Sequence, residues 1–254
     1  MSELILADSL FPSDNELEIP TLRLDMQPLS VEIPFVCFGE QKRTYQMNGR
    51  GTLHFYTDDY RFSAIYDHPE KVFQHNPANI VEPNYSLFNE TPIAFGMQAI
   101  YKKRMIARQL QENGIRVFVD LNVASKFYKL NLLGVPAGYS HFCTRGYSDR
   151  LNYLQFEYEM AKAIAGDNPL TFVVYGGGRL CKQFCIENKC IYVNPIIDIK
   201  NKSKAAVKKI EQTVAFMGEP FDAKKALETH TTKLLDAQVE NYTKLLEQSN
   251  EARE

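Results

Sequence analysis

Three acidic residues follow apolar runs of the chain, each at the point where its run ends. They are Asp59 after residues 53–57, Glu82 after residues 79–81, and Asp120 after residues 115–119. The runs have the length and the β-branched and aromatic content of buried strands. The carboxyl ends of parallel strands meet at one edge of a sheet, so we predict that the three carboxylates lie close together.

Carboxylates that meet in this way can bind Mg²⁺ or Mn²⁺, or divide into a general acid and a general base. Asp59, Glu82 and Asp120 are therefore the candidate catalytic residues, and Mg²⁺ is the candidate for a cofactor that the sequence does not identify. The alternative is a structural role, because acidic residues after strands often cap turns and helices. That alternative is favoured for any one residue and is weaker for the three together.

Basic residues enter one face of a helix that we expect over residues 91–113. Thr91 and Pro92 suit its start and Gly114 its end. The first half of this face is apolar, and the second half carries Arg104 and Arg108. These guanidinium groups either bind an anion or extend along the sheet and pair with nearby carboxylates. The second interpretation is favoured.

A run of three glycines follows the fifth expected strand and precedes a helix. Bare amides in such a turn can bind phosphate or carboxylate groups, and a plain tight turn is the alternative. The dinucleotide fingerprint would need a glycine where Cys181 stands, and the Walker spacing is absent. The candidate anion-binding residues are Arg104, Arg108, Arg145, Gly176, Gly177 and Gly178.

The cysteines and histidines give no metal or nucleophile motif. Their spacing does not match a zinc site, so we predict no metal ligands among them and favour buried structural thiols. No Gly-x-Ser-x-Gly elbow is present for a histidine to serve. The five cysteines are Cys37, Cys143, Cys181, Cys185 and Cys190, and the five histidines are His54, His68, His75, His141 and His230.

Composition limits the class of protein. The chain has 254 residues and a formal net charge of -2, which argues against a surface coated with basic residues for duplex binding. A local basic groove is still allowed, and five lysines between residues 200 and 209 could contact a phosphate backbone. No run is long enough to span a membrane and no signal peptide is evident, so a cytoplasmic protein is expected.

The order of expected elements predicts an α/β fold. Its core, residues 51–199, should contain a mainly parallel sheet of five or six strands, or a partial (β/α) barrel. A proline-rich extended arm with short edge strands, residues 1–50, should pack on this core. A helix over residues 62–73, interrupted at Pro69, should follow the first core strand. Residues 200–254 should form a helical tail, with a final helix over residues 223–248.

Five short motifs occur in an order that resembles a phage and mobile-element family known only as a domain of unknown function. They lie at residues 54–59, 83–86, 101–104, 111–117 and 134–136, where the family pattern is H-F-Y-x-x-D, P-D-F-S, Y-R-x-R, Q-x-x-G-x-x-V and G-x-P. The chain departs from this pattern at Asn84, where the family has an acid, and at Lys102, where it has an arginine. The resemblance implies a phage, prophage or plasmid setting in a bacterial cytoplasm and no established reaction.

Two functions compete on these grounds. The first is a mobile-element protein that binds or processes nucleic acid, with the carboxylates near the bound group. The second is a non-catalytic module that binds a host or phage protein through the C-terminal helix. A metal-dependent hydrolase acting on a nucleotide or sugar is a further alternative. No membrane partner is expected.

Overall fold

The computed structural model describes residues 11–40 and 47–195, together with residues 225, 228–229 and 232–233. The chain divides into two compact units, Met1–Val193 and Asn194–Glu254. In the second unit Asn194 and Pro195 have no regular secondary structure, and the five other described residues are helical. The lysines at 200–209, and the predicted final helix apart from those five residues, lie outside the described residues.

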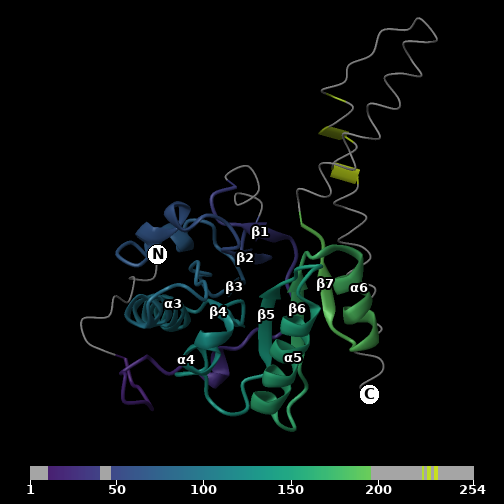
Figure 1. Ribbon diagram of the computed structural model, residues 1–254. Helices are drawn as coiled ribbons and strands as arrows, with labels where there is room; N and C mark the ends of the chain where they lie inside the picture. The colour runs from purple at the N-terminus through teal and green to yellow at the C-terminus, as the bar shows by residue number, and fades with distance from the viewer. Residues whose placement is uncertain (1–10, 41–46, 196–224, 226–227, 230–231, 234–254) are drawn as a thin grey trace, which may run out of the picture. The chain divides into compact units, whose positions relative to one another are not determined.

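A parallel sheet of seven strands forms the first unit, and the strands lie side by side in chain order (Figure 1). The strands are β1 (Phe35–Cys37), β2 (Thr52–His54), β3 (Asn79–Val81), β4 (Arg116–Asp120), β5 (His141–Arg145), β6 (Thr171–Tyr175) and β7 (Ile191–Val193). The predicted count of five or six was therefore too low. The additional strand, β1, directly follows Pro34 in the N-terminal arm, and its three residues are too few to show an alternating pattern.

From β2 onward, helices connect the strands along the outside of the sheet, which is the arrangement of repeated βαβ units. The α-helices are α2 (Glu70–Phe73), α3 (Ile93–Glu112), α4 (Tyr128–Asn131), α5 (Leu151–Ala165) and α6 (Gly178–Glu187). Four short 3-10 turns accompany them: η1 (Leu24–Met26), η2 (Asp59–Arg61), η3 (Ser63–Ile65) and η4 (Ser125–Phe127). The helix predicted over residues 62–73 was wrong in its first half, which is turns, and α2 begins only after Pro69.

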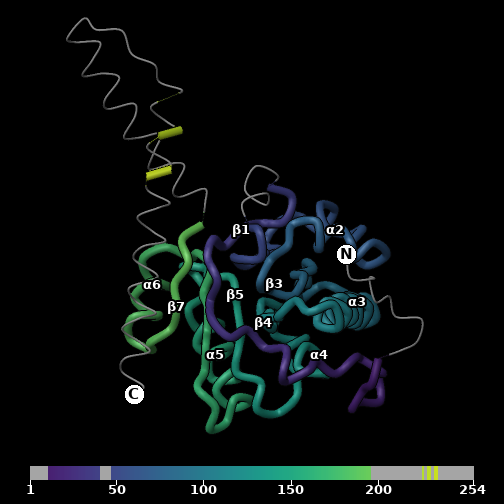
Figure 2. Tube along the Cα trace, turned by 180° about the vertical axis from the view of Figure 1, so that it is seen from behind, coloured from purple at the N-terminus to yellow at the C-terminus, as the bar shows by residue number. Residues whose placement is uncertain are grey.

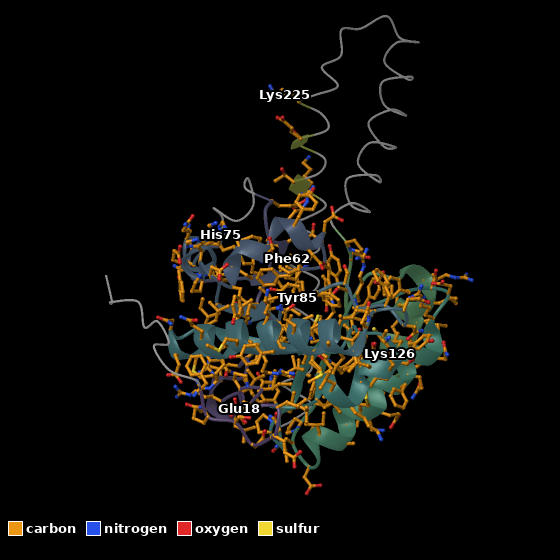
Figure 3. The ribbon with its side chains drawn as sticks, turned by 60° about the vertical axis from the view of Figure 1, so that its left-hand side comes forward. Glu18, Phe62, His75, Tyr85, Lys126 and Lys225 are labelled. Atoms are coloured by element: carbon orange, nitrogen blue, oxygen red, sulfur yellow. The ribbon has the colours of Figure 1, made fainter. Side chains whose placement is uncertain are left out.

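The sheet curves into a nearly closed barrel. The ring of Phe35 on β1 stacks on the ring of Tyr175 on β6, with centroids 6.3 Å apart. The first strand and the last strand but one therefore face each other across an interior. The outward side chains, such as Leu53, Ile80 and Val117, are fully buried in the apolar layer beneath the helices. Figure 3 views α3 from outside, with Phe62 and Tyr85 on one side of the helix and Glu18 on the other.

The N-terminal segment crosses the amino ends of the strands (Figure 2). Four hydrogen bonds, taken in chain order, bind this segment to the starts of β5, β4, β3 and β2. Gln27 Oε1 accepts a bond from the backbone N–H of Ser140, and the Gln27 backbone oxygen accepts one from Arg116. The backbone oxygens of Ser30 and Glu32 accept bonds from the side chains of Asn79 and Thr52. Because these bonds follow the strand order in reverse, residues 27–32 cover the amino end of the barrel beneath four strands. Functional groups that reach solvent from the interior must then do so at the carboxyl ends.

Candidate functional site

Four charged side chains meet without solvent at the carboxyl ends of β3 and β4. Glu82 directly follows β3, Asp120 is the last residue of β4, and α3 supplies Lys103 and Arg104. Arg104 Nη1 donates to Glu82 Oε1 at 2.5 Å, and Lys103 Nζ donates to Asp120 Oδ2 at 3.2 Å. All four side chains are essentially inaccessible to solvent. Two cations and two carboxylates give this ion cluster no net charge, which is the condition under which buried charges are tolerated.

Further hydrogen bonds occupy other polar atoms of the ion cluster, while Arg104 Nε is buried without a partner. Asn131 on α4 receives bonds at its backbone oxygen from Arg104 and at Oδ1 from Lys103. The backbone N–H of Asp120 donates to Glu82 Oε2. The cluster thus joins β3, β4, α3 and α4, and in this structure Arg104 is bound to protein oxygens. The described residues contain no group of three or more His, Cys, Asp or Glu side chains arranged to hold a metal ion.

Asp120 also contacts groups in the barrel interior. Its Oδ1 accepts from the Tyr56 hydroxyl at 3.0 Å, which lies 3.3 Å from Cys143 Sγ, and its Oδ2 accepts from Asn84 Nδ2 at 2.9 Å. Burial raises the pKa of Tyr56 and of Cys143, so both groups are protonated at neutral pH. An aspartate in place of Asn84 would put a second carboxylate beside Asp120. The amide instead donates a hydrogen bond to it.

Asp59 lies at the same end of the barrel but serves another contact. Its carboxylate accepts from the backbone N–H and the hydroxyl of Ser86, which ties the loop after β2 to the loop after β3. Among the described residues, no hydrogen bond joins Asp59 to Glu82 or Asp120. The structure therefore brings together two of the three predicted carboxylates, and the third is a partly buried loop contact.

The other two predicted arginines differ in exposure. Arg108 is nearly buried, pairs with Glu112 one turn later on α3, and lies 5.0 Å from the ring centroid of Phe11. Arg145 ends β5 and is exposed, and its guanidinium lies 5.5 Å from the ring centroid of Tyr147. Of the three predicted arginines, Arg145 alone reaches solvent at the carboxyl end of the barrel.

The glycine turn is shaped by close backbone packing. Gly176, Gly177 and Gly178 all have positive φ, and Gly177 is the N-cap of α6. A Cβ on Gly177 would lie 2.6 Å from the backbone carbon of Gly146, whereas a Cβ on Gly178 would meet nothing within 4 Å. The Gly176 N–H donates to Val193 O. The turn thus brings β5, β6 and β7 together, and Gly178 starts α6 at an open surface.

His54 is a buried residue of the interior that the sequence argument did not select. Its ring lies 5.6 Å from that of Phe35 and 4.3 Å from that of Tyr175, between centroids. Nδ1 accepts from the backbone N–H of Tyr56 at 3.3 Å, while Nε2 is buried without a hydrogen-bond partner. Burial lowers the pKa of His54 to about 3, and the Arg145 charge adds to this effect. Alternation with the apolar Leu53 and Phe55 was the feature that could have placed His54 inside.

Comparison with known proteins gives a family and two relatives. The model of a domain of unknown function, DUF4417, matches residues 11–193. The Gene 1 protein of Mycobacterium phage D29 is 26% identical over 178 residues, which are 67% of this chain and 64% of that protein. The Gene 1 protein of Mycobacterium phage L5 is 27% identical over 180 residues, 67% of this chain and 76% of that protein. The chain thus spans slightly less than two thirds of the D29 relative, and no solved structure matches it.

Within the described part of the chain, none of the helices has the length and apolar character that crossing a bilayer requires.

Proposed function

Since the chain belongs to the DUF4417 family, which has relatives in mycobacteriophages, we propose that it is a phage or mobile-element protein that binds single-stranded nucleic acid in the bacterial cytoplasm. The binding surface is the rim at the carboxyl ends of the strands. We define this rim patch by exposed or partly exposed aromatic and arginine side chains: Tyr60, Arg61, Phe88, Arg145, Tyr147 and Arg150.

The single observation that carries the proposal is an aromatic ring with two guanidinium groups against it. Arg145 and Arg150 lie 5.5 and 5.2 Å from the ring centroid of Tyr147, in the loop after β5. Both arginines are exposed, and Arg150 has only a long contact of 3.8 Å with Asp149. A nucleotide offers a flat base and a phosphate within one residue, so this group of side chains matches both parts.

Two neighbouring loops repeat the same chemistry. Tyr60, in the loop after β2, is 74% exposed, and Arg61 lies 5.7 Å from its ring centroid. Phe88, in the loop after β3, is 64% exposed. Because all strands are parallel, these loops share one edge of the barrel with the loop after β5. Contact of large aromatic rings with water is unfavourable, and bases stacked on these rings would remove that contact.

The chemistry of the rim patch favours single strands over duplexes. Bases in a duplex are already stacked on each other, whereas the unpaired bases of a single strand are free to stack on tyrosine and phenylalanine. The net charge of -2 also supplies no broad basic surface for a duplex backbone. Stacking is worth about 1–3 kcal/mol per base and depends little on base identity, so weak sequence preference is expected.

We do not extend the proposal to hydrolysis. The oxygens of Glu82 and Asp120 already accept hydrogen bonds from Arg104, Lys103 and neighbouring groups in the ion cluster. The cluster supports the rim by fixing the ends of β3 and β4 instead.

A fluorescence anisotropy titration with a labelled oligo-dT strand and a matched duplex, at about 50 and 200 mM salt, tests the proposal. Tyr147→Ala should weaken single-strand binding by about 5- to 150-fold, the equivalent of one lost stacking contact. Arg150→Gln should also weaken single-strand binding. The slope of log affinity against log salt concentration should become shallower by about the amount of one phosphate contact.

Lys162→Gln is the matched control for Arg150→Gln. Lys162 is also half exposed, lies 5.4 Å from a tyrosine ring centroid and pairs with an acid, but it is in the last turn of α5, away from the rim. The control should leave binding unchanged. Failure of the strand to bind at the lower salt, or equal losses in the two variants, would refute the proposal.

A further inference from the structure

His54 presents a hydrogen-bond donor with nothing to receive it. Because Nδ1 accepts the N–H of Tyr56, the neutral ring carries its proton on Nε2. That atom is buried and has no partner in the structure. An unsatisfied buried donor destabilises the fold, and this one lies between the rings of Phe35 and Tyr175. A ligand that brings an acceptor to Nε2 would satisfy this donor.

The surroundings of His54 specify a negatively charged acceptor. Arg145 lies two residues after the buried Cys143 on β5, so its side chain starts on the same, inner face of the barrel. Its charge acts on His54, and it acts together with the larger effects of Glu40 and Arg61 on Cys37 of β1. No carboxylate contributes to the pKa of His54. A ligand beside His54 thus meets a cation and a neutral N–H donor, and an anion with several oxygens can use both.

The glycine turn supplies further donors next to the same residues. Tyr175, the register partner of Arg145, is followed directly by the turn that starts α6. The first N–H groups of an α-helix have no partner within the helix, and they favour anions. Gly178 is exposed at the surface. Tyr175 is partly exposed and its ring lies against that of His54, so the Tyr175 side chain extends from His54 to the surface.

We propose that the carboxyl end of the barrel between β2, β5 and β6 binds a phosphate monoester, with His54 Nε2, the Arg145 guanidinium and the first amides of α6 as donors to its three terminal oxygens. The phosphate could be inorganic phosphate, a mononucleotide or the end of a phosphorylated strand, which share this chemistry. The site does not require the rim patch to bind single strands, although Arg145 belongs to both.

Calorimetric titration of the full chain with inorganic phosphate, thymidine 5′-monophosphate and thymidine tests the site. Both phosphates should bind and thymidine should not, and tighter binding of the nucleotide than of inorganic phosphate would identify a nucleotide as the source. A 5′-phosphorylated oligo-dT that binds more tightly than the unphosphorylated strand would identify a strand end. Absence of heat and of any melting-temperature increase with both phosphates at millimolar concentration would overturn the proposal.

His54→Phe separates a binding role from a structural one. The variant keeps a ring between Phe35 and Tyr175 and removes the Nε2 donor. It also leaves the Tyr56 N–H without its acceptor, so the melting temperature should fall, and the folded variant should lose phosphate affinity by about 10- to 100-fold. Arg145→Gln should weaken phosphate binding similarly, and Arg150→Gln should not. Unchanged phosphate affinity in His54→Phe would overturn the proposal.

A measurement on the unmodified chain covers the case in which His54→Phe does not fold. In a ¹⁵N-resolved histidine spectrum, phosphate should shift the Nε2 resonance of one neutral histidine that is protonated at Nε2, and leave the exposed His68 unchanged. A titration that moves none of the neutral histidines would also overturn the site. Binding of an unphosphorylated strand in His54→Phe reports on the rim patch alone, so the two proposals fail separately.

Discussion

Replacement of Glu82 by glutamine tests whether the ion cluster determines the stability of the barrel. Glu82 is fully buried and accepts from Arg104 at 2.5 Å, and Lys103 Nζ lies 3.7 Å from its other oxygen. Glu82→Gln would leave the cluster with one uncompensated positive charge in a site that water does not reach. Loss of one partner from a buried pair costs about 3–5 kcal/mol. This is a large part of the roughly 5–15 kcal/mol that stabilises an ordinary domain.

Urea denaturation followed by circular dichroism measures this loss. With a slope of about 3 kcal/mol per M, the midpoint should fall by roughly 1–1.7 M. Arg104→Met should cost a similar amount because it leaves Glu82 uncompensated. The double variant should cost less than the sum by about 1–3 kcal/mol, since removing both members of the pair restores charge balance.

The control is Glu159→Gln, because Glu159 forms an exposed pair with Lys162 at 3.2 Å. An exposed pair is worth less than about 1 kcal/mol. If Glu82→Gln costs no more than Glu159→Gln, or if the double variant shows simple addition, the ion cluster does not act as one unit and the argument fails.

Two further predictions concern the glycine turn and a buried acid. Gly177→Ala should lower the free energy of unfolding in urea by about 2–5 kcal/mol, because it combines a positive φ with a clash against Gly146. Gly178→Ala also has a positive φ but meets open space, so it should lower the free energy by only about 1–2 kcal/mol. Equal losses in the two variants would contradict the packing argument. Burial raises the pKa of Glu157 well above its usual value. As pH rises above about 4.5, the unfolded chain loses the proton of this carboxyl group while the folded chain keeps it, so the free energy of unfolding decreases. Glu157→Gln should therefore gain stability over the native chain between pH 5 and 8, by up to about 1.4 kcal/mol per unit, and Glu159→Gln should show no such trend.

The elements with strong local patterns could be predicted from the sequence. The helix expected over residues 91–113 is α3, Ile93–Glu112, because a proline at its start and Gly114 at its end limit it on both sides. The segment 62–73 was not predictable in the same way. Its apolar residues, among them Phe62 and Ile65, are buried through turns that fit the barrel edge, so burial there does not follow a helical period.

The candidate site was predictable only in its topology. Parallel strands bring Glu82 and Asp120 to one edge, as the sequence indicated. Which cation binds which carboxylate depends on the rotation of α3 over β3 and β4, and local sequence does not determine that rotation. Asp59 shows the same limit, because its contact with Ser86 comes from the path of two loops. His54 was overlooked because its importance comes from an interior that exists only after the sheet curves.

The segment that covers the amino end of the barrel has a consequence for the order of folding during synthesis. The bond between Gln27 and Ser140 joins residues 113 positions apart, so the segment that leaves the ribosome early cannot reach its final place until β5 has been made. Residues 27–32 are thus fixed later than the strands that they cover. The nascent barrel stays open at that end until β5 has been translated.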